Sequence, residues 1–350
     1  MTGVDGKGFA MRRFPLQVLL MLLMGACRSS STTPAPSPAA ARPVQMIPLA
    51  GPTAAKSSEL SGLAWHGETL VLLPQYADKA NQDGSGAVYA LTKVQIQDFL
   101  RGKTTTALAP RAVPFSAPSI RDKVPGFEGF ESIAFSGDRV FLTIESHDKT
   151  GMKGYLVAGT TDAALSQIQV DTDHIAPVSP QAPLGNMSEE ALVIAGEKLF
   201  TFYEANGLNV NANPVAHQFN VALETQPSLP FPHLEYRVTD ATPPDDQGRF
   251  WVINYFYPGD AAMLQPPTDP LAQRWAPNLA PTHDGSVERL VQLQLTESGV
   301  ALVDRAPIWL ELGPSEATRN WEGIAPLGSG FLLVTDSYPQ TLFGYVEAQP

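Results

Sequence analysis

The chain contains a single cysteine, Cys27, among its 350 residues. An intrachain disulfide is therefore impossible, and zinc or redox chemistry based on paired cysteines is excluded. The six histidines are scattered and show no paired spacing of the kind used by histidine-metal hydrolases. The sequence also lacks the Gly-x-Ser-x-Gly nucleophile elbow and the full phosphate-binding loop that ends in Gly-Lys-Ser/Thr. The fold must be held by its core alone.

Positive charge is also scarce. Lysine and arginine number 23 against 35 aspartates and glutamates, so the net charge is −12. This balance argues against nucleic acid or anionic lipid as a partner, because both would be repelled. It suits a protein that concentrates cations.

No apolar run is long enough to cross a membrane as a folded helix, but residues 16–24 form a short one after Arg12 and Arg13. This run ends in Met24-Gly25-Ala26-Cys27, which resembles the lipobox of bacterial lipoproteins. The resemblance implies that residues 1–27 are a signal peptide with lipobox and that Cys27 is acylated. Residues 28–43 then form a disordered Ser/Pro/Ala tether. The alternative is an ordinary secretory signal in which Cys27 is incidental.

Lipidation would place the protein in the bacterial cell envelope, outside the cytoplasm. Its partner there would be the membrane itself, reached through the lipid on Cys27. The anchoring membrane would be either the outer membrane or the membrane facing the periplasm.

A short pattern occurs five times in the remaining residues, 44–350. In each copy an apolar strand begins about nine positions after a polar residue, with a tight turn between them; the fourth copy has one extra turn residue. The strands begin at Leu70, Val140, Leu199, Phe250 and Phe331. Repeats built from strand, turn and strand are typical of a β-propeller.

The predicted fold is therefore all-β, a propeller of five four-stranded blades. The outer strand of the third blade is expected at 233–238, and the first strand of the fourth at 240–244. The last blade has only three strands, so residues 44–49 are predicted to pair with 342–347 and close the ring. A six-bladed propeller is the alternative, with its extra blade in 256–284. That stretch is dense in proline, which favours an insertion.

The polar residues of the five copies would meet at the axis of the propeller. They are Ser61, Glu131, Glu190, Asp240 and Glu322. Four carboxylates in one ring repel each other, and a bound cation would relieve the repulsion. A large cage of oxygen ligands favours Ca²⁺ over Mg²⁺ or zinc. The sequence thus predicts a central Ca²⁺; the alternative is that these acids only begin strands at an exposed rim.

A second ring is expected five residues into each second strand, one layer further out. Its members are Gln75, Glu145, Glu204, Tyr255 and Asp336. Among them, Glu145, Glu204 and Asp336 are candidate catalytic residues, because a carboxylate beside the axis could act as acid or base. Equally, the second ring could only cap strand ends. Glu59, Glu128 and Glu189 precede the first ring and could act as substitute ligands.

Long loops are predicted on the face where the first strand of each blade begins, including the insertion at 256–286. Since binding groups reside in long loops, this face and the acid ring should form the working surface.

The ring order and the phrases Glu59-Leu60-Ser61-Gly62-Leu63 and Trp321-Glu322-Gly323-Ile324-Ala325 resemble the soluble calcium-activated nucleotidase (apyrase) propellers. They equally resemble the esterase-like phytase propeller family. Both resemblances imply a propeller with bound calcium.

The predicted function is an extracytoplasmic, calcium-centred propeller that binds a small molecule or protein on its long-loop face. The alternative is a calcium-dependent hydrolase of phosphate esters, phosphate anhydrides or other esters.

Overall fold

Each copy of the repeat forms an antiparallel hairpin whose second strand is mostly buried. Strand β3 (Thr69–Pro74) is buried along nearly its whole length, as is β20 (Gly330–Thr335). A strand of a half-solvated sheet would alternate polar and apolar residues. Here the pattern is continuous because neighbouring blades pack on both faces of each sheet. One such core cluster joins Val71 and Val113 of the first blade to Ile133 of the second.

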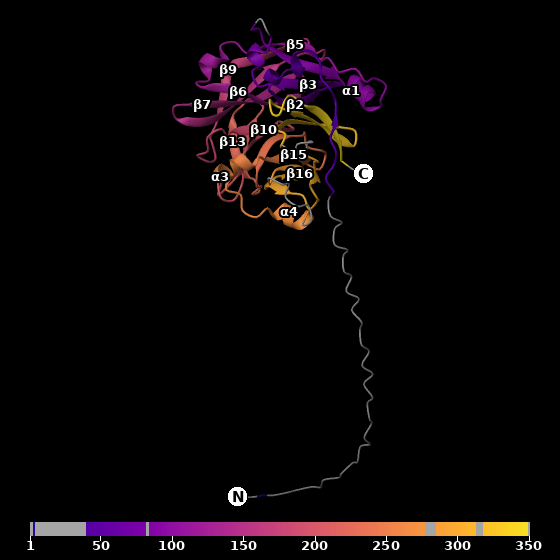
Figure 1. The fold of residues 1–350 in the computed structure, drawn as a ribbon. Helices are drawn as coiled ribbons and strands as arrows, with labels where there is room; N and C mark the ends of the chain where they lie inside the picture. Colours follow the sequence, from indigo (N-terminus) through magenta and orange to yellow (C-terminus); the bar gives the residue numbers. More distant parts are fainter. Residues whose placement is uncertain (1–2, 4–39, 82–83, 277–284, 313–317, 349–350) are drawn as a thin grey trace. The chain divides into compact units, whose positions relative to one another are not determined.

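The computed structural model describes residue 3 and residues 40–81, 84–276, 285–312 and 318–348 (Figure 1). Cys27, the predicted signal peptide and most of the predicted tether lie outside these ranges. No helix in the described part of the chain has the length and hydropathy needed to cross a bilayer.

The strands form five four-stranded blades. The first blade contains β2 (Leu60–His66), β3, β4 (Ala87–Thr92) and β5 (Arg111–Ser116). The second contains β6 (Phe127–Ser136), β7 (Arg139–Asp148), β8 (Gly151–Thr160) and β9 (Ile168–Val178). Parallel pairing of β5 with β9 joins these two blades at their outer strands.

The other three blades are separate sheets. The third contains β10 (Glu189–Ala195), β11 (Lys198–Tyr203), β12 (Val215–Asn220) and β13 (Thr225–Pro230). The fourth contains β14 (Arg237–Ala241), β15 (Arg249–Phe256), β16 (Val287–Thr296) and β17 (Gly299–Leu302), with β18 (Ile308–Trp309) also paired to β16. The fifth contains β19 (Trp321–Leu327), β20 and β21 (Phe343–Glu347), and β1 (Gln45–Met46) completes it.

The innermost strands surround one axis. Strand β2 contacts β6, and contacts then follow in order from β6 to β10, β14, β19 and back to β2. Five inner strands in a closed cycle are the arrangement of a five-bladed propeller, as predicted. Figure 1 shows the late strands, in yellow, beside the first blade in indigo and purple.

Short helices fill the connections between strands. They are η1 (Gly51–Ala54), η2 (Lys56–Ser58), η3 (Ala77–Lys79), α1 (Lys93–Leu100), α2 (Ile120–Lys123), η4 (Pro258–Asp260), α3 (Ala261–Leu264) and α4 (Pro270–Trp275). The last three lie in the predicted insertion at 256–286. Its described part, up to residue 276, therefore forms helices and no strands, which argues against a sixth blade there.

Two predicted strands are wrong. The outer strand of the third blade is β13, not 233–238, and the first strand of the fourth is β14, not 240–244. Pro227 and Pro230 hid β13 from the sequence pattern; an edge strand tolerates proline because one side of its backbone needs no partner. A tight turn, in which the Asn220 amide donates to the Glu224 carbonyl, brings β13 back along β12.

The predicted closure by the N-terminal segment is confirmed, but the ladder is shorter than expected. Gln45 pairs with Tyr345 and Met46 with Gly344. Ile47 follows with its side chain 1% exposed, inside the core cluster between the first and fifth blades. The ring is therefore closed by two residue pairs, a hydrogen bond of 2.8 Å from the Ile47 amide to the Phe343 carbonyl, and the buried Ile47 side chain.

We expect Ile47→Ala to lower the free energy of unfolding by about 2–4 kcal/mol, because it leaves a cavity where the chain closes. Met46→Ala is the matched control, since Met46 is 39% exposed; its cost should be small. Urea unfolding of both variants measures the difference, and equal stability of the two would contradict the importance of this closure.

Candidate functional site

A polar pocket of about 240 Å³ lies at one end of the propeller axis. Its lining is almost entirely acids and amides: Glu59, Ser61, Gln75, Glu131, Glu145, Asn186, Glu190, Arg237, Asn320, Glu322 and Asp336. Four of the five predicted first-ring residues and three of the second ring are therefore in one place. The long-loop face carries the pocket, as predicted.

A β-bulge turns the first-ring side chains toward the axis. In every inner hairpin the pairing register slips at this position, for example between Leu60 and Gly62 and between Glu189 and Ala191. A bulge leaves a residue unpaired and re-aims its side chain. The unpaired residues here include Ser61 and Glu190, which line the pocket.

The fourth blade departs from the predicted ring. Its bulge spans Thr239 and Asp240, and Thr239 holds the position equivalent to Ser61. The two hydroxyls make the same contact one blade on: Ser61 Oγ donates to the Phe130 carbonyl and Thr239 Oγ1 to the Trp321 carbonyl, both at 2.6 Å. Asp240 does not line the pocket, so its assignment to the ring is wrong.

Asp240 instead ties inner strands together deeper along the axis. Its carboxylate accepts hydrogen bonds from Ser132 Oγ at 3.2 Å and from the Ile324 amide at 2.8 Å. The far end of the axis, beyond Ala241, opens into an apolar pocket of about 270 Å³ lined partly by Trp65 and Phe135. The polar chemistry is thus confined to the long-loop end.

Arg237 is the functional residue that the sequence pattern missed. It begins β14 and brings a guanidinium group into the acid-lined pocket. Its Nε donates to Glu204 Oε1, and its two Nη atoms lie 3.8 Å from Asp260 and 3.9 Å from Glu322. The Tyr255 ring lies beneath, 5.5 Å from the guanidinium carbon. Glu204 and Tyr255 of the second ring therefore hold the Arg237 guanidinium in place.

Burial and mutual repulsion raise the pKa values of the acids in the pocket. Burial raises the pKa of Glu131 to about 7, although a hydrogen bond from Gln75 at 3.1 Å opposes this. Burial, together with Glu131 and Glu204, raises the pKa of Glu145 to about 9. Glu145 Oε1 is also buried without a hydrogen-bond partner in the described structure. Both observations favour the protonated form of Glu145 at neutral pH.

Glu204 and Glu322 are buried in the same cluster but face Arg237. Burial raises the pKa of Glu204, and the guanidinium opposes that rise. Burial also raises the pKa of Glu322, again against Arg237. Arg237 itself loses solvation on burial, which lowers its pKa, but the surrounding acids outweigh this and the net shift is upward.

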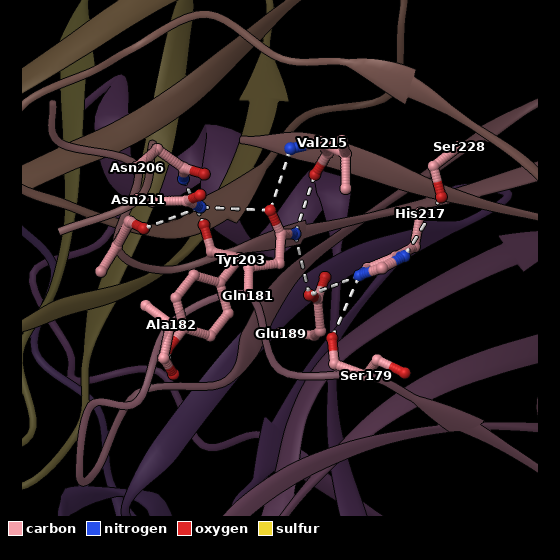
Figure 2. A network of polar contacts seen from close by, with 11 residues as sticks. Ser179, Gln181, Ala182, Glu189, Tyr203, Asn206, Asn211, Val215, His217 and Ser228 are labelled. Carbon is pink, nitrogen blue, oxygen red and sulfur yellow. Dashed lines mark hydrogen bonds and ion pairs between the residues drawn. The ribbon is translucent and has the colours of Figure 1, made fainter. Parts of the chain in front are cut away.

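The three acids that precede the ring have different positions. Glu59 lines the pocket, and Glu128 is partly exposed outside it, 3.9 Å from His147. Glu189 points away from the pocket, into the network shown in Figure 2. There Gln181 donates to Glu189 Oε1 at 3.3 Å, and His217 Nε2 lies 3.7 Å from the same oxygen. Glu189 is therefore a structural acid and not a substitute ligand.

The predicted calcium cage is not assembled as expected. Ser61 is committed to a backbone carbonyl, Asp240 lies outside the pocket, and Arg237 supplies positive charge among the acids. Across the ranges that the structure describes, no three His, Cys, Asp or Glu side chains are grouped as metal ligands. The residues present do not fit the predicted cage, and Ca²⁺ stays a prediction.

Melting experiments test that prediction directly. A ligand that binds only the folded state raises the melting temperature. If calcium binds, adding it to chelated protein should raise Tm, and Glu131→Gln should abolish the rise. An unchanged Tm would contradict the prediction.

Comparison with known proteins shows only distant likeness in fold. No protein-family model matches the chain, and no curated protein does. One similar solved structure is from family 130 of mannoside phosphorylases, described as containing glycoside hydrolases that target β-1,2 mannosidic linkages in Candida mannan. Its TM-score is 0.49 at 10% identity, over 89% of this chain and 97% of that one.

Two further structures belong to the same group of activities. A thermostable family-43 glycoside hydrolase has a TM-score of 0.47 at 9% identity, covering 86% of this chain and 91% of its own. The catalytic domain of the Coprinopsis cinerea family-62 α-L-arabinofuranosidase has a TM-score of 0.44 at 9% identity, covering 89% and 97%.

These findings correct the resemblance expected from the sequence. The similar structures named above come from families of glycoside hydrolases and mannoside phosphorylases, and the expected likeness to apyrase and phytase propellers is wrong. The two functions predicted from the sequence, a calcium-centred binding propeller and a calcium-dependent phosphate-ester hydrolase, are therefore wrong as well. The physical reason is that the repeat phrases encode the strand–turn–strand skeleton, and one skeleton carries many activities.

Proposed function

We propose that the axial pocket hydrolyses the glycosidic bond of a neutral sugar. The observation that carries the proposal is the pair Glu145 and Asp336, two carboxyl groups of one pocket in contrasting environments. Glu145 is 6% exposed with an unpartnered oxygen, whereas Asp336 is half-buried and accepts a hydrogen bond from the Tyr338 amide at 2.8 Å. Glycoside hydrolysis uses a pair of carboxyl groups, one as the general acid and the other as base or nucleophile.

In this proposal Glu145 is the general acid. Its proton goes to the oxygen of the leaving group as the glycosidic bond breaks, which prevents an alkoxide from forming. Asp336 is the carboxylate on the fifth blade that takes a proton from the attacking water, whose oxygen forms the new bond to the sugar carbon as the glycosidic bond breaks. Glu204 is not a catalytic residue here, because its carboxylate is paired with the Arg237 guanidinium.

The lining favours a neutral, hydroxyl-rich substrate. Carboxylates accept hydrogen bonds from sugar hydroxyls, and amides such as Gln75 and Asn320 can both donate and accept. The acids would repel a phosphate ester. Arg237 is the one arginine of the pocket lining, and its charge is already paired with Glu204 and Glu322. Phosphorolysis is disfavoured for the same reason. The names of the similar solved structures agree with this proposal but, at about a tenth identity, do not carry it.

The volume limits what the pocket itself can hold. About 240 Å³ lies below the roughly 300–1,000 Å³ of a drug-sized ligand site. One sugar ring is therefore a better match than a chain of several.

The test is a screen of purified protein against aryl glycosides of mannose, xylose, galactose and arabinose, with aryl phosphates and nucleotides in parallel. We expect turnover of at least one glycoside and none of the phosphates. Asp336→Asn should lose the glycoside activity, and Glu297→Gln, which alters an exposed acid in the β16–β17 turn, should keep it. Turnover of phosphates alone would overturn the proposal.

We further propose that the protein acts outside the cytoplasm, anchored to the envelope membrane through a lipid on Cys27. The support is the resemblance of Met24-Gly25-Ala26-Cys27 to a lipobox, since Cys27 lies outside the described residues. Labelling with a palmitate analogue should mark the protein and should fail in Cys27→Ala.

A further inference from the structure

Tyr338 is held at the rim of the pocket by the residues that line it. Its amide donates to Asp336 Oδ1 at 2.8 Å, and its carbonyl accepts from the Asn320 amide at 3.2 Å. Asp336 and Asn320 both line the pocket. Asp336 and Asn320 therefore both fix the position of the Tyr338 backbone.

The loop that carries Tyr338 is fixed to the first blade as well. Thr341 Oγ1 donates to the Ala55 carbonyl at 2.9 Å, next to η2. Lys56 of η2 places its ammonium group 6.0 Å from the centre of the Tyr338 ring. Glu59, which follows η2, lines the pocket. The ring thus lies at the junction of the fifth and first blades, close to the pocket mouth.

The Tyr338 side chain is nevertheless 48% exposed. Tyrosine has an apolar ring and a polar tip, and a half-exposed tyrosine whose backbone is fixed is suited to contact a ligand. The apolar C–H face of a sugar ring matches such an aromatic face.

A second observation points to a ligand at the same place. Asn320 Oδ1 is buried without a hydrogen-bond partner among the residues described. A buried acceptor left unpaired costs about 1–3 kcal/mol, so a donor from a ligand would be stabilising. A sugar hydroxyl is such a donor.

We propose that Tyr338 and Asn320 form a second sugar subsite, which binds the neutral sugar next to the one in the axial pocket. The inference rests on the proposed glycoside hydrolysis for its ligand class and deepens it. The substrate would then be a disaccharide or a longer oligosaccharide. Its second sugar ring would stack on Tyr338, and one of its hydroxyls would donate a hydrogen bond to Asn320 Oδ1.

The experiment compares binding of a disaccharide with that of the matching methyl monosaccharide. Titration calorimetry would use Glu145→Gln protein, which keeps the pocket but cannot turn over. The probes are xylobiose, mannobiose, galactobiose and arabinobiose with their methyl glycosides. The disaccharide of the preferred sugar should bind about tenfold more tightly than its methyl glycoside, as expected for one aromatic contact and a hydrogen bond.

Tyr338→Ala should remove that gain and leave monosaccharide binding unchanged, while Tyr338→Phe should keep it. Tyr257→Ala is the matched control, because Tyr257 is 49% exposed but its carbonyl is bound by Asp260 outside the pocket lining. A Tyr338→Ala protein that keeps the disaccharide preference would overturn the subsite, and so would absence of binding by every probe. Binding that follows this pattern without any hydrolysis would leave the subsite standing and reject the proposed reaction.

Discussion

Glu145→Gln is expected to lower kcat/KM for glycoside hydrolysis by about 10²–10⁴-fold, the range that a positioned general acid contributes. Glutamine matches glutamate in shape but carries no proton that it can transfer to a leaving oxygen. Glu145 is 6% exposed and its Oε1 lacks a partner, so the substitution removes the acid without breaking a hydrogen bond at that atom. The loss should therefore reflect chemistry and not unfolding.

The leaving group offers an internal control. A nitrophenolate leaves without help from an acid, whereas a sugar alkoxide needs a proton. Glu145→Gln should thus impair disaccharide hydrolysis far more than nitrophenyl glycoside hydrolysis. Equal impairment of both substrates would show that Glu145 supports the pocket and does not donate the proton.

The pH profile gives a second readout on the same residue. Because burial and neighbouring acids raise the pKa of Glu145 to about 9, it keeps its proton through neutral pH and loses it above that value. The kcat/KM of the parent should fall on the alkaline side as this proton is lost. The alkaline fall should disappear in Glu145→Gln.

The sequence was sufficient to predict the skeleton because propeller blades repeat. A polar residue about nine positions before each apolar strand located the inner hairpins, and the bulge at that residue explains why four of the five line the pocket. Closure of the ring by residues before the first blade followed from counting strands. These features depend on local order along the chain, which a single sequence displays.

The rest depends on exceptions that one sequence does not display. In the fourth blade Thr239 holds the first position of the bulge, and Asp240 holds the second, as Ser132 does in the second blade; neither Asp240 nor Ser132 lines the pocket. Arg237 lies three residues before Asp240, in a stretch predicted to be the end of the third blade. Once β13 is assigned to Thr225–Pro230, Arg237 begins an inner strand and must face the axis region. Because the prolines of β13 hide that strand from the sequence pattern, the pattern does not place Arg237 in the pocket. The positive charge of the site therefore cannot be predicted from it.

That charge balance leads to the largest expected effect on stability. Arg237→Met should lower the free energy of unfolding by about 3–5 kcal/mol near neutral pH, because it removes one partner of a buried ion pair. The Arg237 side chain is 14% exposed and that of Glu204 is 0% exposed, so neither group recovers solvent when the pair is broken. Urea unfolding measures the loss.

Two further variants separate the charge from the packing. Arg121→Met removes an arginine from a more exposed pair with Asp78, whose side chains are 38% and 10% exposed, and should cost much less. Adding Glu204→Gln to Arg237→Met should restore part of the lost stability, because the carboxylate left without its partner is then neutral. A double variant no more stable than Arg237→Met would assign the effect to lost packing around Tyr255.

The loss should also depend on pH, with a sign that follows from the acids. Burial already raises the pKa of Glu204, and Arg237 is the group that opposes this rise. Without Arg237 the folded state holds its proton more tightly, so stability is retained at low pH and lost as the pH rises above the ordinary glutamate pKa. Arg237→Met should therefore be closest to the parent at about pH 5 and furthest from it at about pH 8. A destabilisation that is the same at both pH values would show that Arg237 does not hold these carboxylates ionised.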